Sequence, residues 1–94
     1  MTLKMFSIYD KATEVFNQPF FMLTKAEALR AFIKMANDHD TQIANSPHDF
    51  HLYYLGTYDN STAMVNQDKG IEDFGSAAQL TQKDNVLEIK EKTA

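Results

Sequence analysis

The chain has 94 residues, a formal net charge of −4 at pH 7 and no cysteine. A chain of this length forms one domain with one core, and 44% hydrophobic residues, with seven Phe and four Tyr, supply the apolar surface for it. The lack of cysteine excludes disulfides, thiolate metal sites and a cysteine nucleophile. The acidic balance argues against a strongly basic nucleic-acid binder. Most of the excess acid follows Tyr58, however, so the first part of the chain is nearly neutral and is able to present a basic face.

The first predicted element is a strand from Leu3 to Asp10, with apolar side chains on both faces. After a polar turn, the chain returns in a second predicted strand from Glu14 to Leu23. Pro19 cannot donate a hydrogen bond to a neighbouring strand, so we expect this strand to lie at an edge or to contain a bulge. Its run from Phe20 to Leu23 places large side chains on both faces, of which one is core and the other is a candidate interface.

An amphipathic helix follows, and its start is well marked. Thr24 and Glu27 match the capping box, in which a hydroxyl accepts from an amide of the first turn. The apolar residues from Ala28 to Ala36 recur at helical spacing and form one stripe that is expected to pack on a sheet. A polar stop begins at Asn37, and Thr41 to Asp49 is predicted to be a loop or short irregular turn.

A third strand is predicted from Phe50 to Tyr58, because its side chains alternate. The two predicted faces carry Phe50, Leu52, Tyr54 and Tyr58 on one side and His51, Tyr53, Leu55 and Thr57 on the other. A polar turn then leads into a short hairpin strand from Ala63 to Val65. Beyond it, Gly70 and Gly75 are expected to frame a polar loop, and Ser76 to Leu80 is expected to add a helical turn.

Together these elements predict an α+β domain over residues 1–80. Its expected architecture is a small, mainly antiparallel four-stranded sheet in ββαββ order, with one amphipathic helix packed on one face. Residues 81–94 are charged and lack a sustained apolar face, so we expect an acidic, flexible C-terminal tail. The start of the chain has no continuous apolar run, which favours neither a signal peptide nor a membrane span.

The histidines form the one group that suggests a metal or acid–base site. His39, His48 and His51 alternate with aspartates, but His48 and His51 would face opposite sides of a strand unless a turn at Pro47 brought them together. A surface loop is the simpler interpretation. The chain contains no nucleophile elbow, Walker loop, dinucleotide fingerprint or zinc-protease motif, and its three glycines leave little scope for a phosphate-cradling loop. We therefore expect no enzyme activity, no metal and no cofactor.

Basic and aromatic residues suggest a second kind of site. Single-stranded nucleic acid is held by cations along its phosphates and by exposed rings that stack on its bases. The candidate contacts are Lys4, Lys11, Lys25, Arg30, Lys34, Tyr53 and Tyr58, with Tyr9, Phe16 and Phe20 as further possible rings. Aromatic residues at alternating strand positions are also typical of a core, so this pattern alone does not decide between the two.

A protein-interaction module is the third interpretation. Strands with two apolar faces, together with an edge strand from Phe16 to Leu23, suit a homodimer that presents a groove. Small domains with surplus apolar surface often bury it by self-association. From the residues alone, this interpretation leads.

Four blocks of the sequence resemble a known family in order and spacing. They read KMFSIYDKATE, TKAEALRAF after the Pro19-Phe20-Phe21 segment, SPHDFHLYYLGTYDNST and FGSAAQL, and they cover roughly residues 4–80. The most distinctive runs from Pro47 to Asp59. Together they resemble the small nonstructural protein of gokushovirus-type microviruses, which are single-stranded DNA phages.

That resemblance implies a nonstructural, DNA-binding protein that acts in genome replication and packaging in the cytoplasm of the infected bacterium. It implies single-stranded DNA as a partner, with phage or host replication or packaging proteins as possible further partners. From the residues themselves we expect a homodimer, because of the surplus apolar surface, and no membrane. The alternative is a homodimeric interaction or regulatory module without intrinsic DNA affinity. Because the chain is acidic, DNA binding through few phosphate contacts would be weak and strongly dependent on salt.

Overall fold

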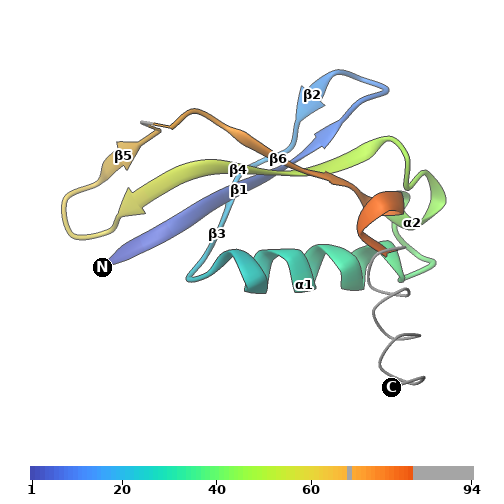
Figure 1. The fold of residues 1–94 in the computed structure, drawn as a ribbon, viewed down its shortest axis with the longest axis horizontal. Helices are drawn as coiled ribbons and strands as arrows, with labels where there is room; N and C mark the ends of the chain where they lie inside the picture. Colours follow the sequence, from blue (N-terminus) through green and yellow to red (C-terminus); the bar gives the residue numbers. More distant parts are fainter. Residues whose placement is uncertain (68, 82–94) are drawn as a thin grey trace.

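The computed structural model describes residues 1–67 and 69–81, which form one curled antiparallel sheet with helical segments on one of its faces (Figure 1). The strands are β1 (Thr2–Asp10), β2 (Val15–Phe16), β3 (Phe20–Met22), β4 (Phe50–Asp59), β5 (Met64–Asn66) and β6 (Glu72–Ser76). The helices are α1 (Lys25–Ala36) and α2 (Gln42–Asn45), and residues 77–81 are also helical. The predicted α+β class and antiparallel sheet are confirmed.

Two long strands, β1 and β4, form the centre of the sheet. They pair from Thr2 opposite Asp59 to Asp10 opposite Phe50. Each has an outer edge made of two short strands, because β2 and β3 both pair with β1, whereas β5 and β6 both pair with β4. The predicted count of four strands and the ββαββ order are not confirmed, since the described residues form six strands.

The edge next to β1 is interrupted around Pro19, which has no N–H to donate. Asn17 still holds the chain against β1, since its N–H donates to the carbonyl of Ile8 at 2.8 Å and its carbonyl accepts from Ser7 Oγ at 2.6 Å. The predicted strand from Glu14 to Leu23 is therefore at an edge, as expected, but it is divided into two.

The edge next to β4 contains a strand where we expected a polar loop. Strand β6 lies between Gly70 and Gly75 for most of its length and pairs with β4, with a register shift between Leu52 and Tyr53. The extra residue in β6 is Phe74, which packs towards the core. This bulge interrupts the alternation of side chains, so the strand is not evident in the sequence.

A second bulge lies in the middle of β4. Met5 is opposite Gly56 and Phe6 is opposite Tyr54, so Leu55 is an extra residue between them. Gly56 has a φ of +140°, and a Cβ placed there would lie 2.2 Å from the carbonyl oxygen of Asn66. Only glycine therefore allows β5 to approach β4 at this point.

Helix α1 supplies most of the cover for the sheet. Thr24 is its N-cap, and its Oγ1 accepts from the amide of Glu27 at 3.1 Å and donates to the Glu27 carboxylate at 3.2 Å. The predicted helix start is thus confirmed. Ala28 and Phe32 are fully buried against the sheet. The buried core consists of Phe6, Ile8, Ala28, Phe32, Ile43, Phe50, Leu52, Ala77 and Leu80.

Two short helical segments close the end of the core. Thr41 caps α2 by accepting from the amide of Ala44, so the expected loop contains one helical turn that buries Ile43. Ser76 and Gln79 form a reciprocal capping box at the start of residues 77–81, with distances of 3.0 and 3.1 Å. The helical turn predicted there is present. Residues 82–94, the bulk of the predicted flexible tail, lie outside the described residues.

Candidate functional site

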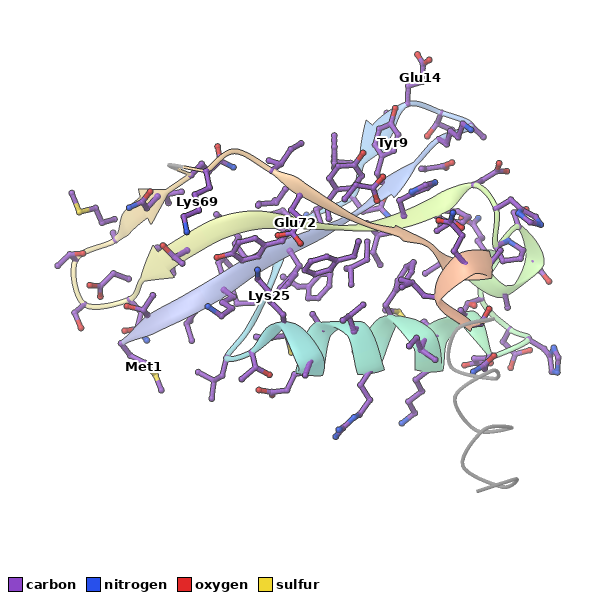
Figure 2. All side chains as sticks on the ribbon, viewed as in Figure 1. Met1, Tyr9, Glu14, Lys25, Lys69 and Glu72 are labelled. Atoms are coloured by element: carbon purple, nitrogen blue, oxygen red, sulfur yellow. The ribbon has the colours of Figure 1, made fainter. Side chains whose placement is uncertain are left out.

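The sheet face opposite α1 carries a row of aromatic side chains. We call it the aromatic face and define it by Tyr9, Phe16, Phe21, Tyr53 and Tyr58. On β1, the alternation of a strand sends Phe6 and Ile8 into the core and turns Ser7 and Tyr9 to the other side. Figure 2 shows Tyr9 on the side of the sheet away from α1. The aromatic face is thus a direct consequence of a sheet covered on one side.

Three of its rings form a cluster. The ring centroid of Tyr9 lies 4.6 Å from that of Phe16 and 5.8 Å from that of Tyr53, and Phe16 and Tyr53 are 5.1 Å apart in an edge-on arrangement. These separations are those of favourable aromatic pairs. The three residues come from β1, β2 and β4, so the cluster spans three neighbouring strands. Its rings fix one another's positions.

A pair of rings continues the aromatic face towards the other end of the sheet. Phe21 on β3 and Tyr58 on β4 have their centroids 5.4 Å apart. Phe21 and Phe16 remain 43% and 42% exposed. Because β2 and β3 pair with the same edge of β1, one after the other, and β4 pairs with its other edge, the two ring groups lie along one continuous surface. That surface offers open ring area rather than an enclosed pocket.

The charged groups next to the ring cluster are few and mixed. A hollow of about 390 Å³ is lined by Tyr9, Lys11, Glu14, His51 and Tyr53. Lys11 brings one positive charge to this rim and Glu14 one negative charge. The cations of the aromatic face are therefore too few to make it a strongly basic surface.

Asp73 on β6 sets the electrostatics of the cluster. Its carboxylate lies 3.2 Å from Nδ1 of His51. Partial burial, followed by the negative charge of Asp73, the nearby Tyr9 and a hydrogen bond with Asp73, raises the pKa of Tyr53 above its ordinary value. Tyr53 therefore stays a neutral phenol at physiological pH and presents an uncharged ring.

A second shifted pKa lies at the far end of the sheet. The carboxylate of Asp59 accepts from the amide of Ser61 at 2.8 Å and lies 3.5 Å from the N-terminal ammonium of Met1. The hydrogen bond from Ser61, assisted by the charge of the N-terminus, holds the pKa of Asp59 below its ordinary value. This contact joins the N-terminus to the β4–β5 turn and is separate from the ring cluster.

The structure divides the predicted basic residues among three surfaces of the chain. Lys11 is at the rim of the aromatic face. Lys4 and Lys25 instead line a pocket on the helix side of the sheet. Arg30 and Lys34 are exposed on the part of α1 that points away from the sheet, since the buried positions of the helix are Ala28 and Phe32.

The two predicted tyrosines share one face, although the alternation in the sequence places Tyr53 and Tyr58 on opposite faces. The bulge at Leu55 adds one residue between them and so reverses the alternation for the second half of β4. Tyr58 lies opposite Leu3, on the side away from α1. The predicted face of Tyr58 is thus wrong, and its place in a shared aromatic surface follows from the bulge.

The histidines do not form a metal site within the described residues. His51 is on β4 beside Asp73, whereas His39 and His48 are exposed in the segments that flank α2. Among residues 1–67 and 69–81, no group of three His, Cys, Asp or Glu side chains is placed to hold a metal ion. In the same part of the chain, no helix is long and apolar enough to cross a membrane.

Two residues of these surfaces, Phe21 and Lys69, are not among the candidate DNA contacts predicted from the sequence. Phe21 lies within an apolar run in which the core-facing positions cannot be told from the others without the register of β3 on β1. Lys69 joins Lys4 and Lys25 in the pocket, but it is far from both in the sequence. The adjacent Gly70, with a φ of +73°, marks the turn that brings Lys69 back to the sheet.

Comparison with known proteins gives one match. A family model described as Phage ORF5 protein matches residues 3–80, which is most of the chain. No curated protein and no solved structure matches it. The matched range includes β4, helix α1, all of β1 except Thr2, and all five residues of the aromatic face. The chain therefore belongs to the Phage ORF5 protein family and is a phage protein.

Proposed function

We propose that this phage protein is a non-catalytic, nonstructural protein of the gokushovirus type that binds single-stranded DNA during viral genome replication and packaging. It acts in the cytoplasm of the infected bacterium. The observation that carries the proposal is the aromatic face, whose five rings lie on the four neighbouring strands β1, β2, β3 and β4. Within residues 1–67 and 69–81, no helix covers this face (Figure 1). Family membership gives the phage setting.

Stacking is the interaction that this face offers. A base placed against an exposed ring gains about 1–3 kcal/mol, and the gain does not depend on which base it is. Phe16 and Phe21 present the largest open areas, while Tyr9 and Tyr53 hold Phe16 from its sides. A duplex keeps its bases stacked inside, so this surface favours the single strand.

Phosphate contacts contribute less on this face. Lys11 is the lysine at its rim, and Arg30 and Lys34 of the same protomer lie beyond the helix. Each neutralised phosphate of a single strand contributes a slope of about −0.7 in log affinity against log salt. One or two contacts therefore give a slope of about −0.7 to −1.4, which is shallow for a DNA-binding protein.

Fluorescence anisotropy with labelled single-stranded and duplex DNA, at low and near-physiological salt, tests the proposal. We expect saturable binding that prefers the single strand, and a loss of roughly 5- to 150-fold in affinity for Tyr53→Ala or Phe16→Ala, from the free energy of one stacked base. Tyr53→Phe keeps a ring and retains the affinity. Met64→Ala removes a 71% exposed apolar side chain of β5 and serves as the control.

The result that refutes the proposal is also clear. If neither DNA form binds at low salt, or if the ring variants bind as well as the parent protein, base stacking on this face is excluded. Equal losses of DNA affinity in Tyr53→Ala and Met64→Ala would likewise show that the rings contribute no more to binding than other exposed apolar side chains.

A second candidate function is a homodimeric interaction module that uses the same surface. It is favoured by the exposed apolar side chains along the β2–β3 edge, where Val15 is 55% and Leu23 is 50% exposed beside Phe16 and Phe21. Light scattering distinguishes the two functions. A dimer that becomes a monomer in Phe16→Ala and Phe21→Ala, with no DNA binding by either form, assigns the aromatic face to self-association.

A further inference from the structure

A pocket of about 350 Å³ lies on the other side of the sheet, between the start of α1 and the β5–β6 connection. Its lining includes Lys4 from β1, Lys25 from α1 and Lys69 from the connection. Three of the chain's nine Lys and Arg side chains therefore converge on one pocket of an acidic protein. Its volume is at the lower end of the range for small-molecule sites.

Two of the lysines lie beside the same ring. The ammonium of Lys25 is 4.6 Å from the ring centroid of Tyr54, and that of Lys4 is 6.0 Å from it. Lys25 also lies 5.8 Å from the ring centroid of Phe74. An electron-rich ring attracts each cation, but the cations repel one another. An anion bound between them would relieve that repulsion.

One carboxylate balances part of this charge. Glu72 on β6 accepts from Lys25 Nζ at 3.4 Å, and Figure 2 shows the two side chains pointing towards each other. Within the described residues, neither Lys4 nor Lys69 has a carboxylate within ion-pair distance. Among the described side chains at the pocket, three ammonium groups and one carboxylate sum to a charge of +2.

The backbone of the pocket leaves room for a ligand. A Cβ placed at Gly70 would meet nothing within 4 Å, so there is open space beside this turn. Gly56 also lines the pocket, but the position of its missing Cβ is taken up by the carbonyl of Asn66, so the open space lies beside Gly70. The ligand therefore meets lysine ammonium groups and the open side of a backbone turn, a combination that suits a small, highly charged anion.

We propose that this pocket binds a phosphomonoester carried by a nucleotide. At neutral pH a phosphomonoester carries a charge between about −1.5 and −2 and three acceptor oxygens, which matches the local charge of +2 and the three lysines. An internal phosphodiester carries a single negative charge and makes a poorer match. The proposal rests on the function proposed above only for the source of the phosphate, which is either the 5′ end of a DNA strand or a free nucleotide.

Isothermal titration with four probes tests the proposal: inorganic phosphate, thymidine 5′-monophosphate, and an oligothymidylate with and without a 5′-phosphate. We expect the phosphorylated oligonucleotide to bind about tenfold more tightly than the unphosphorylated one, as charge-assisted hydrogen bonds to the terminal phosphate require. If thymidine monophosphate binds as tightly as the phosphorylated strand, the source is the free nucleotide. A weaker monophosphate assigns the site to DNA ends.

Variants test whether the gain in affinity from the 5′-phosphate arises in the pocket. Lys69→Gln and Lys4→Gln are expected to lower the affinity for the phosphorylated probe by about three- to tenfold each. Lys34→Gln removes the same charge from the far side of α1 and leaves the affinity unchanged. Circular dichroism checks that all variants are folded, which these exposed or half-exposed positions allow.

Equal affinity for the two oligonucleotides, or an unchanged affinity in Lys69→Gln, would overturn the proposal. These outcomes are distinguishable from a failure of the DNA-binding role proposed for the aromatic face. Tyr53→Ala leaves binding of thymidine monophosphate unchanged if the pocket is the site. Loss of strand binding in Tyr53→Ala without any effect of the 5′-phosphate would support the aromatic face alone.

Discussion

Replacing Gly56 by Ala tests the central irregularity of the sheet. The φ of +140° is a conformation that residues with a Cβ rarely adopt, and such strain costs about 1–3 kcal/mol. The new Cβ would also lie 2.2 Å from the carbonyl oxygen of Asn66, so β5 must move away from β4. Repacking forced by such an overlap costs about a further 1–3 kcal/mol.

The expected destabilisation by Gly56→Ala is therefore about 2–6 kcal/mol. A chain of this length has a total stability of roughly 5–14 kcal/mol, so the loss is a large share of it. Each kcal/mol lowers the melting temperature of a domain of this size by about 4–8 °C. Chemical denaturation followed by circular dichroism measures the free energy of unfolding, and a thermal scan measures the shift in Tm.

Gly70→Ala is the matched control for this variant. Its φ of +73° also disfavours a side chain, but a Cβ there has nothing within 4 Å. We expect a loss of about 1–2 kcal/mol from the left-handed backbone alone. If Gly56→Ala costs no more than Gly70→Ala, the close approach of β5 to Gly56 does not contribute to stability, and the reasoning fails.

Three further predictions concern the helix, the core and the ring cluster. Thr24→Ala removes the cap on the amide of Glu27 and should cost about 1 kcal/mol in a denaturant titration, whereas Thr24→Ser should cost much less. Phe32→Ala empties a fully buried site and should cost about 3–5 kcal/mol; a loss below 1 kcal/mol would mean that α1 does not pack as described. Asp73→Asn should lower the raised pKa of Tyr53, as read from phenolate absorbance in an alkaline titration, with Tyr53→Phe identifying the signal. Because the pKa of Tyr53 is raised in the folded state, the stability linked to Tyr53 is present below its unfolded pKa and is lost as the pH rises through the folded pKa. If the titration of Tyr53 is unchanged in Asp73→Asn, the carboxylate of Asp73 does not contribute to the raised pKa.

The parts of the fold that depend on local signals were predictable from the sequence. The cap at Thr24, the apolar stripe around Phe32 and the long alternating strands each follow from contacts between residues close in the chain. Pro19 likewise indicated an edge position through its missing N–H. Each of these features needs no knowledge of the register between distant strands.

The features that the sequence analysis missed or predicted wrongly depend on pairing between distant segments of the chain. Strand β6 lacks a regular alternation because Phe74 is an extra residue, and only its pairing with β4 defines it as a strand. The face of Tyr58 depends on the bulge at Leu55 in the pairing of β4 with β1, next to the glycine that β5 approaches closely. The pocket unites Lys4, Lys25 and Lys69, whose convergence no sequence spacing indicates.

One irregularity thus contributes to both proposed surfaces. Without the extra Leu55, the period of two in β4 would turn Tyr58 to the helix side and remove its ring from Phe21. The same bulge exposes the backbone of Gly56 to the lysine pocket. Since β1 has no matching extra residue, its own alternation continues unbroken and keeps Lys4 on the pocket side and Tyr9 on the aromatic face. The bulge therefore lets one stretch of β4 contribute Tyr58 to the aromatic face and Gly56 to the lysine pocket, and a variant that straightens it should weaken both surfaces together.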